Sequence, residues 1–270
     1  MGKNEEIGIR LRRKDINDKI LCKCVDALIA LVNDDVLAFD ALINIIQVSA
    51  YWSLKVFSDR YEKWKQDSKD YKRLPNEKRD AIDVKLRDCF CEADSVDGWA
   101  KLRGMFAERI VERAFLKWYK ENARGFIPWE YETGCAVYVN GRLIKYTCAE
   151  SEMQRERCRQ ISQSCLPNGS CKGDRETVDI GTTTLIGGNR EISACFVETK
   201  LMPRGFHFLD GEYLAYLKKS MDKEQVGCQV VVASLSECTM IKNRVDLCLG
   251  DGGDYIEIWG IDKIRKLIYG

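Results

Sequence analysis

The chain has 270 residues, of which 45% are hydrophobic and 31% are charged. This composition is typical of a globular protein, and the length allows one large domain or two modest ones with ample core. The formal net charge is only +1, so no global positive charge indicates nucleic-acid binding, and any such binding has to come from a local patch.

The first six residues are polar and no apolar segment follows them, so we expect no signal peptide and a cytoplasmic protein. The 13 cysteines should then stay reduced, and their odd number argues against a complete set of disulfides. None has paired CxxC spacing, so we predict mostly small buried side chains, with a bound zinc or iron–sulfur cluster as the alternative. The single histidine, His207, argues against Ser-His-Asp hydrolases and HExxH zinc sites.

The N-terminal third is predicted to be helical. Residues 7–13 hold a small basic cluster that is either a solvated arm or a phosphate contact. Apolar periodicity predicts a helix over 15–32, and the turn at 33–35 supplies an N-cap for the next one. The most apolar run, 36–57, carries a polar stripe that begins at Asp40, which favours a buried bundle helix over a membrane span.

From Ser58 to Asp97 the chain is strongly charged. Aromatic residues alternate with lysines, a pattern that indicates either a nucleic-acid-binding face or, as we favour, an exposed amphipathic helix. The Leu74-Pro75-Asn76 segment interrupts it before a further helix that ends near Cys91. We therefore expect a helical region over 1–97 and a separate domain over 98–270.

The second region begins with a predicted helix from Trp99 to Tyr119, capped by Asp97. Two alternating strands around Asn140-Gly141 then predict a hairpin, because this dipeptide suits a tight two-residue turn. Later in the chain we expect a helix over 210–221 that is capped by Asp210, a strand over 229–233, and a final strand and helix over 255–268.

Two short apolar strands, 177–181 and 193–200, are the most informative stretch of the sequence. Residues two apart in a strand point to the same face, so Glu198 and Lys200 should lie side by side. If the strand that carries Asp179 pairs beside them, two carboxylates and an amine converge. Carboxylate oxygens can hold a divalent metal, and an amine can steady a developing anion or a water molecule.

At these residues the chain resembles the PD-(D/E)XK nuclease superfamily, the fold of most type II restriction endonucleases. An aspartate enters one strand, a hairpin follows through Gly187-Gly188-Asn189, and Glu198-Thr199-Lys200 ends the next strand. Val178 stands where the family often has proline. The predicted order of helix, strand, strand, helix and strand is similar to the core of the superfamily.

The resemblance implies an α/β (mixed α+β) fold, with a central mixed sheet flanked by helices and a helical N-terminal region that serves dimerisation or embraces DNA. It also implies magnesium-dependent hydrolysis of double-stranded DNA at a specific sequence by a homodimer, with no membrane partner. Asp179 and Glu198 would bind Mg²⁺ and Lys200 would orient the attacking water. The helix before the strands would add Glu108, or else Glu112.

The resemblance suggests further contacts around this site. Glu212, in the first turn of the helix after the motif, is a possible substitute acid, and three cations would contact DNA: Arg204, Lys218 and Lys219. Two alternatives stay open. One is a repair or junction nuclease of the same superfamily without sequence specificity, and the other is a non-catalytic DNA-binding protein held by a cysteine-bound metal.

Overall fold

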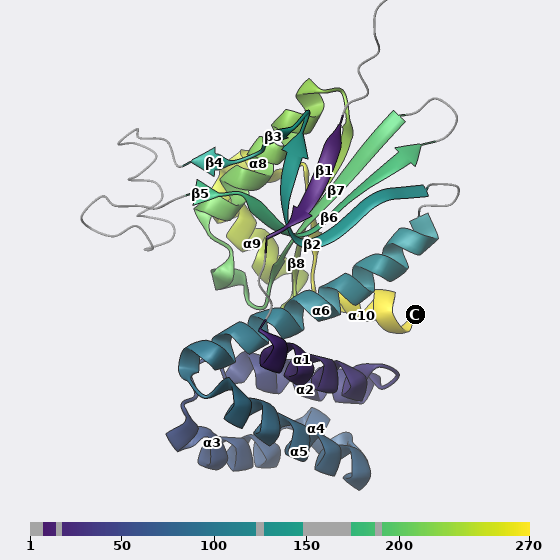
Figure 1. Ribbon diagram of the computed structural model, residues 1–270. Coiled ribbons are helices and arrows are strands. Elements are labelled where there is room, and N and C mark those ends of the chain that lie inside the picture. The colour runs from purple at the N-terminus through teal and green to yellow at the C-terminus, as the bar shows by residue number, and fades with distance from the viewer. Residues whose placement is uncertain (1–7, 15–17, 123–126, 148–173, 187–190) are drawn as a thin grey trace, which may run out of the picture. The chain divides into compact units, whose positions relative to one another are not determined.

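The computed structural model describes residues 8–14, 18–122, 127–147, 174–186 and 191–270 (Figure 1). The chain forms two compact units. The sheet unit contains the described residues before Ile16 together with Tyr119–Gly260, and the helical unit contains Ile16–Trp118 together with Ile261–Gly270. Within the described ranges, no helix is both long and apolar enough to cross a membrane.

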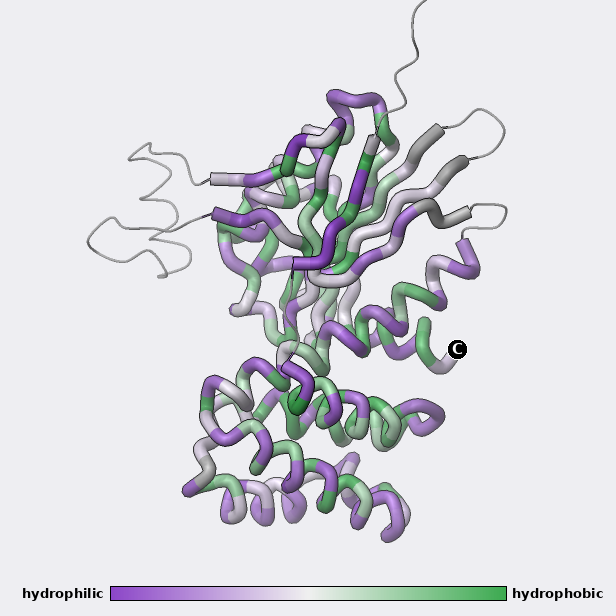
Figure 2. The backbone as a smooth tube through the Cα atoms, viewed as in Figure 1, coloured by the Kyte–Doolittle hydropathy of each residue, from purple (hydrophilic) through white to green (hydrophobic). Residues whose placement is uncertain are grey.

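The helical unit contains mainly amphipathic helices, and Figure 2 shows apolar and polar residues alternating along them. Its elements are α1 (Lys19–Val32), α2 (Val36–Val48), α3 (Leu54–Asp67), α4 (Lys69–Arg73), α5 (Asn76–Ala93), most of α6 (Val96–Asn122) and α10 (Ile261–Tyr269). The predicted cap before α2 is confirmed, because the Asp35 side chain accepts from the amides of Leu37 and Ala38. Such a cap satisfies amides that have no partner within the helix.

The helix predicted over 36–57 is wrong in its length, because α2 ends at Val48 and α3 begins at Leu54. Tertiary contacts end α2 here. Arg103 is only 6% exposed, and its Nε donates to the Ile46 carbonyl at 2.5 Å. Its two other nitrogens reach the Gln47 and Ala50 carbonyls at 3.4 and 3.5 Å. The buried guanidinium thus satisfies carbonyls that the helix end leaves without partners.

The aromatic residues of the charged segment are buried inside the helical unit, whereas most of its charged residues are exposed. The helices there are therefore amphipathic, as favoured, and the aromatic rings do not form a nucleic-acid-binding face. Tyr61 is fully buried, and Trp64 and Tyr71 are 7% and 6% exposed. Both tyrosine hydroxyls donate to Asp83 at 2.7 Å, and the Trp64 indole donates to Asn44 at 2.7 Å. Each buried polar group therefore has a partner, and these rings are not free to stack on bases.

The division between the two units differs from the boundary expected at residues 97 and 98. Helix α6 begins at Val96, so Asp97 lies in its first turn and is not its cap. The residues of α6 up to Trp118 belong to the helical unit, where Trp99, Phe106 and Phe115 are at most 1% exposed. The C-terminal α10 returns to the same unit, and Arg265 pairs with Asp40 at 2.6 Å.

The sheet unit is a mixed sheet in the order β1-β2-β6-β7-β8-β9, with β3 paired to β2. Its elements are β1 (Ile9–Arg13), β2 (Ile127–Val139), β3 (Arg142–Leu143), β4 (Tyr146–Thr147), β5 (Asp174–Arg175), β6 (Thr177–Ile186), β7 (Glu191–Lys200), η1 (Pro203–Gly205), α8 (Phe208–Lys223), β8 (Gly227–Ser234), α9 (Cys238–Leu249), η2 (Gly250–Gly253) and β9 (Ile256–Trp259). The mixed α/β class is as expected.

Strand directions follow from the connections. Strands β1, β2, β6 and β7 pair antiparallel, whereas β7, β8 and β9 pair parallel. Parallel neighbours need a crossover, and α8 and α9 supply the two crossovers. One core packs α8 and α9 on the sheet, with Phe196, Leu214, Val232 and Val245 at most 1% exposed.

The N-terminal basic cluster forms strand β1, so the expectation of a solvated arm is wrong. Arg10 pairs with Glu130 at 2.7 Å, and the Arg12 guanidinium lies over the Tyr138 ring. The predicted hairpin turn is confirmed, since Asn140 and Gly141 have φ of 50° and 77°. Its first strand, β2, is part of the main sheet, because it pairs with both β1 and β6.

Replacing Arg103 with Met should lower the free energy of unfolding of the helical unit by about 2–3 kcal/mol, because three carbonyls at the end of α2 lose a buried donor. Urea denaturation followed by circular dichroism measures the change. The control is Arg109→Met, which removes an exposed ion pair with Glu112 and should cost less than about 1 kcal/mol. Equal losses in the two variants would contradict this role for Arg103.

Candidate active site

The Asp179 carboxylate continues the contact between β6 and β7 beyond the end of their ladder. The two strands pair from Ile186 and Glu191 as far as Ile180 and Val197. Beyond that pair, the Thr199 amide of β7 donates to Asp179 Oδ2 at 2.5 Å. A side chain thus takes the place of a backbone carbonyl, and it fixes the Asp179 carboxylate at the end of β7.

Glu198 and Lys200 share one face of β7, as their spacing predicts. Lys200 Nζ lies 2.6 Å from Glu198 Oε1. Glu198 is fully buried, and the Lys200 side chain is 16% exposed. Phe196, two residues earlier on the same strand, packs in the core below α8 and α9. A carboxylate is thus held at the edge of an apolar core, which is costly unless cations compensate it.

Arg175 is the second cation at Glu198, and no local sequence pattern predicts it. One terminal nitrogen lies 2.5 Å from Glu198 Oε1, and the other lies 2.5 Å from Asp210 Oδ1. Arg175 ends the short strand β5, whose pairing with Tyr146 of β4 brings it to this place. The guanidinium therefore bridges two buried carboxylates, a geometry that its planar fork of donors favours.

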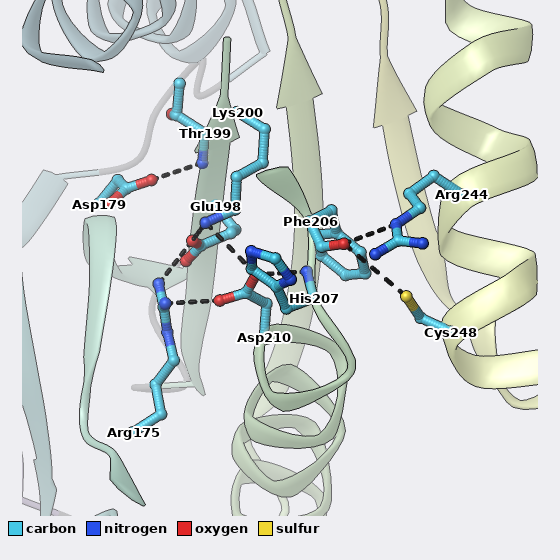
Figure 3. Close-up of polar contacts among 10 residues, drawn as sticks. All are labelled: Arg175, Asp179, Glu198, Thr199, Lys200, Phe206, His207, Asp210, Arg244 and Cys248. Atoms are coloured by element: carbon cyan, nitrogen blue, oxygen red, sulfur yellow. Dashed lines mark hydrogen bonds and ion pairs between the residues drawn. The ribbon is translucent and has the colours of Figure 1, made fainter. Parts of the chain in front are cut away.

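Asp210 brings a third carboxylate from the first turn of α8. It is 2% exposed, and its Oδ2 lies 3.4 Å from Lys200 Nζ and accepts from the His207 amide at 2.8 Å. The expectation that Asp210 caps this helix is wrong by three positions, because α8 begins at Phe208 and its N-cap is His207. Figure 3 shows Arg175, Glu198, Lys200 and Asp210 converging, with Asp179 at the neighbouring strand. We call these five residues the charged cluster.

The carboxylates of the cluster stabilise the charged forms of its two cations. Burial disfavours the Lys200 ammonium, but the carboxylates of Glu198 and Asp210 more than offset it, so the pKa of Lys200 is raised. Burial likewise opposes the Arg175 charge, and Glu198, Asp210 and Asp179 raise the pKa of that guanidinium. Both groups are therefore cations at neutral pH, and Lys200 can donate hydrogen bonds but cannot act as a base.

The segment before α8 is anchored from α9. Arg244 Nε donates to the Phe206 carbonyl at 2.7 Å, and Cys248 Sγ lies 3.8 Å from the same oxygen (Figure 3). These contacts fix the chain just ahead of α8, and thereby the turn that carries Asp210. Next to them, burial and then the nearby cations lower the pKa of His207, although Asp210 opposes the shift. The imidazole is thus neutral at neutral pH.

The structure brings Asp179, Glu198 and Lys200 together but places the other predicted acids elsewhere. Glu108 is exposed on the part of α6 that belongs to the helical unit, and Glu112 pairs there with Arg109 at 2.8 Å. Glu212 is on α8, where it accepts from the Tyr146 hydroxyl at 3.1 Å. No contact joins Glu212 to the charged cluster among those that the structure gives for described residues. Asp210, two positions earlier, occupies the place expected for it.

The three predicted DNA-binding cations lie outside the charged cluster. Arg204 is exposed in η1, with Nη2 3.9 Å from the Met202 sulfur. Lys218 forms an ion pair with Asp222 on α8. Lys219 is exposed on the same helix. Three arginines that follow β4, at 155, 157 and 159, lie outside the described residues.

The described cysteines behave mainly as small apolar side chains. Cys24, Cys89, Cys135, Cys195 and Cys248 are buried, and none of these five is in a disulfide. Throughout the described ranges, no three His, Cys, Asp or Glu side chains are grouped so as to hold a metal ion. The cysteines at 148, 158, 165 and 171 lie outside these ranges.

Comparisons of the chain with models of protein families, with curated proteins and with solved structures found no match.

Two members of the charged cluster, Arg175 and Asp210, were missed as site residues. Arg175 lies next to a long polar stretch without periodicity, and only its pairing with β4 brings it to Glu198. Asp210 carried a usable signal, since an acid in the first turn of the helix after the motif strand points back toward the end of that strand. Because an acid at this position also suits a helix cap, Asp210 was predicted as the cap and Glu212 as the site residue.

Replacing Arg175 with Met should lower the free energy of unfolding of the sheet unit by about 3–5 kcal/mol, because two buried carboxylates lose a cation. The control is Arg13→Met, which removes a pair with Glu132 at 3.9 Å on a half-exposed side chain and should cost less than about 1 kcal/mol. Chemical denaturation of both variants measures the difference. A loss for Arg175→Met no larger than that of the control would contradict the bridge.

The lowered pKa of His207 predicts a pH dependence of stability. Unfolding restores the ordinary pKa of about 6.5, so the unfolded chain binds more protons than the folded one as the pH falls below that value. Stability should therefore fall as the pH drops from about 7 to 5.5, and His207→Gln should flatten this slope. Thermal unfolding across that range measures it. An unchanged slope in the variant would contradict a half-buried, neutral imidazole.

Proposed function

We propose that this protein is a magnesium-dependent endonuclease of the PD-(D/E)XK superfamily that hydrolyses phosphodiester bonds of double-stranded DNA. The observation that carries the proposal is the convergence of Asp179, Glu198 and Lys200 at the ends of two adjacent strands. The order of β6, β7, α8 and β8 also supports it, since the resemblance implies strand, strand, helix and strand in succession, although β2 to β5 stand between α6 and β6.

The residues present fit a magnesium ion. Mg²⁺ prefers oxygen ligands, and it is commonly held by one or two carboxylates together with water and substrate phosphate. Glu198 Oε2 is a buried carboxylate oxygen that has no hydrogen-bond partner in the structure. Asp179 and Glu198 would hold the ion, and the substrate would complete its coordination. When bound, the ion would lower the pKa of a water molecule and neutralise charge on the phosphate.

Groups of the chain itself supply the remaining functions at this site. Lys200, held as a cation between Glu198 and Asp210, donates to the attacking water and to the phosphate oxygen on which negative charge develops. The Thr199 amide keeps the Asp179 carboxylate in place. Arg175 balances the negative charge of Glu198 and Asp210 in a buried site. No histidine base is required.

Within this proposal, we favour a sequence-specific restriction endonuclease that acts as a homodimer, because a two-fold symmetric protein matches a palindromic site. Digestion of plasmid DNA separates it from a repair or junction nuclease of the same superfamily. Discrete fragments indicate a recognition sequence, whereas a smear or cutting only at unusual structures indicates the other class.

Incubation of supercoiled plasmid with the protein and Mg²⁺ tests the activity. The wild type should cut, and EDTA should abolish cutting. Asp179→Asn and Lys200→Gln should each lower the rate by about 10²–10³-fold or more while DNA binding persists, because each removes charge stabilisation at the phosphate. Glu212→Gln is the matched control, since Glu212 contacts Tyr146, and it should keep most of the activity. Equal cutting by wild type and Lys200→Gln would rule the mechanism out.

A further inference from the structure

A second feature of the sheet unit is a groove between the β2–β3 hairpin and the C-terminal half of α8. Its volume is about 670 Å³. Its lining includes the apolar residues Val139, Leu143 and Ile144, and its charged lining consists of Arg142, Lys219, Lys223 and Glu224. Three cations and one carboxylate thus surround one hollow, and none of these groups belongs to the charged cluster.

The cations of the groove differ from their neighbours in having no described counter-ion. On α8, Lys218 forms an ion pair with Asp222, and on α9, Lys242 pairs with Asp246 at 2.7 Å. Among the described residues, no ion pair involves Arg142, Lys219 or Lys223, and all three are exposed. The one carboxylate of the lining, Glu224, accepts from the Asn140 side chain at 3.1 Å. The groove therefore presents a net positive charge to an anion.

The helical geometry of α8 places two of these cations on one face. Lys219 and Lys223 are four residues apart, so they project from the same face of the helix, and Tyr216 lies on that face one turn earlier. Tyr216 is 42% exposed, with its ring centroid 6.3 Å from that of Tyr146. Arg142 faces them from β3 across the groove. A row of cations along one helix face suits a repeating anion better than a single compact one.

Helix α8 connects the groove to the charged cluster. Its first turn carries Asp210, which contacts Arg175 and Lys200, and its last turns carry Lys219 and Lys223. At 1.5 Å per residue, these lysines lie roughly 14 to 20 Å along the helix axis from Asp210. Phosphates follow one another at about 3.4 Å along the duplex axis in each strand, so a strand that follows α8 has four to six phosphates over this length.

We infer that this groove binds the phosphate backbone of duplex DNA, about four to six phosphates from the one at the charged cluster. The inference rests on the proposed function, since it assigns the groove to the same substrate. Arg142, Lys219 and Lys223 contact successive phosphates from two sides. The contact is independent of base sequence, and it sets the position of the duplex along α8.

The test measures binding of a labelled duplex by fluorescence anisotropy, without divalent cation, over a series of NaCl concentrations. The groove variant carries Arg142→Gln, Lys219→Gln and Lys223→Gln. It should bind about tenfold more weakly at low salt, and the slope of log K against log[NaCl] should fall by about three for each chain bound. The control variant carries Arg13→Gln, Lys145→Gln and Lys242→Gln, three exposed cations paired with carboxylates, and should keep the wild-type slope.

A groove variant that binds with the wild-type affinity and slope would overturn the inference, even if the wild type cuts DNA. So would an equal loss in the control variant, or a wild type that does not bind DNA. If the slope of log K against log[NaCl] falls in the groove variant alone, the inference is supported, whether or not the protein cleaves DNA. Binding through the groove without any cutting in Mg²⁺ would reject the proposed activity while supporting the DNA contact.

Discussion

The ion pairing of the buried Glu198 carboxylate is the interaction on which the rest of the sheet unit depends. Glu198 follows the apolar run of β7 and has no exposed surface, so its charge is tolerated only because Lys200 and Arg175 lie within 2.6 Å of one oxygen. An apolar residue of similar size would fill this position at lower cost. The presence of a charged group at this position, with its second oxygen unpartnered, is therefore the observation on which the proposed chemistry chiefly rests.

Several elements of the fold serve to hold this charge in place. Arg175 arrives on the short β4–β5 pair, which forms a sheet of its own. Asp210 arrives on the first turn of α8, whose preceding carbonyl, that of Phe206, is bound by Arg244. The parallel pairing of β7 with β8 requires a crossover, and α8 is that crossover. Helix α8, which connects β7 to β8, therefore also carries the third carboxylate, Asp210. Nearer its C-terminal end, the same helix carries the lysines that line the groove.

Several predictions that rest on local features of the sequence are confirmed. The Asp35 cap, the Asn140-Gly141 turn and the pairing of the two motif strands follow from short-range rules on side-chain hydrogen bonds, positive φ and alternation. The approach of Lys200 to Glu198 follows from strand periodicity alone. These rules involve neighbours of at most a few residues, or strands joined by a short connection, so a single sequence contains the information.

Long-range contacts account for most of what was missed. Strand β1 pairs with β2 across more than a hundred residues, and α10 packs with the N-terminal helices after the sheet unit is complete. No local pattern specifies either contact, and this is why the expected division at residue 97 failed. The end of α2 at Val48 likewise depends on Arg103, which lies more than fifty residues later. The bridge from Arg175 to Asp210 belongs to the same class.

The most direct test of the central claim is a crystal structure of the protein with Mn²⁺ and an uncleavable duplex, in which anomalous scattering locates the metal. We predict a peak between the Asp179 and Glu198 carboxylates, with Lys200 Nζ directed at the scissile phosphate. Bound DNA with no metal at these carboxylates, or a metal held by other residues, would contradict it and leave the charged cluster as a purely structural ion network.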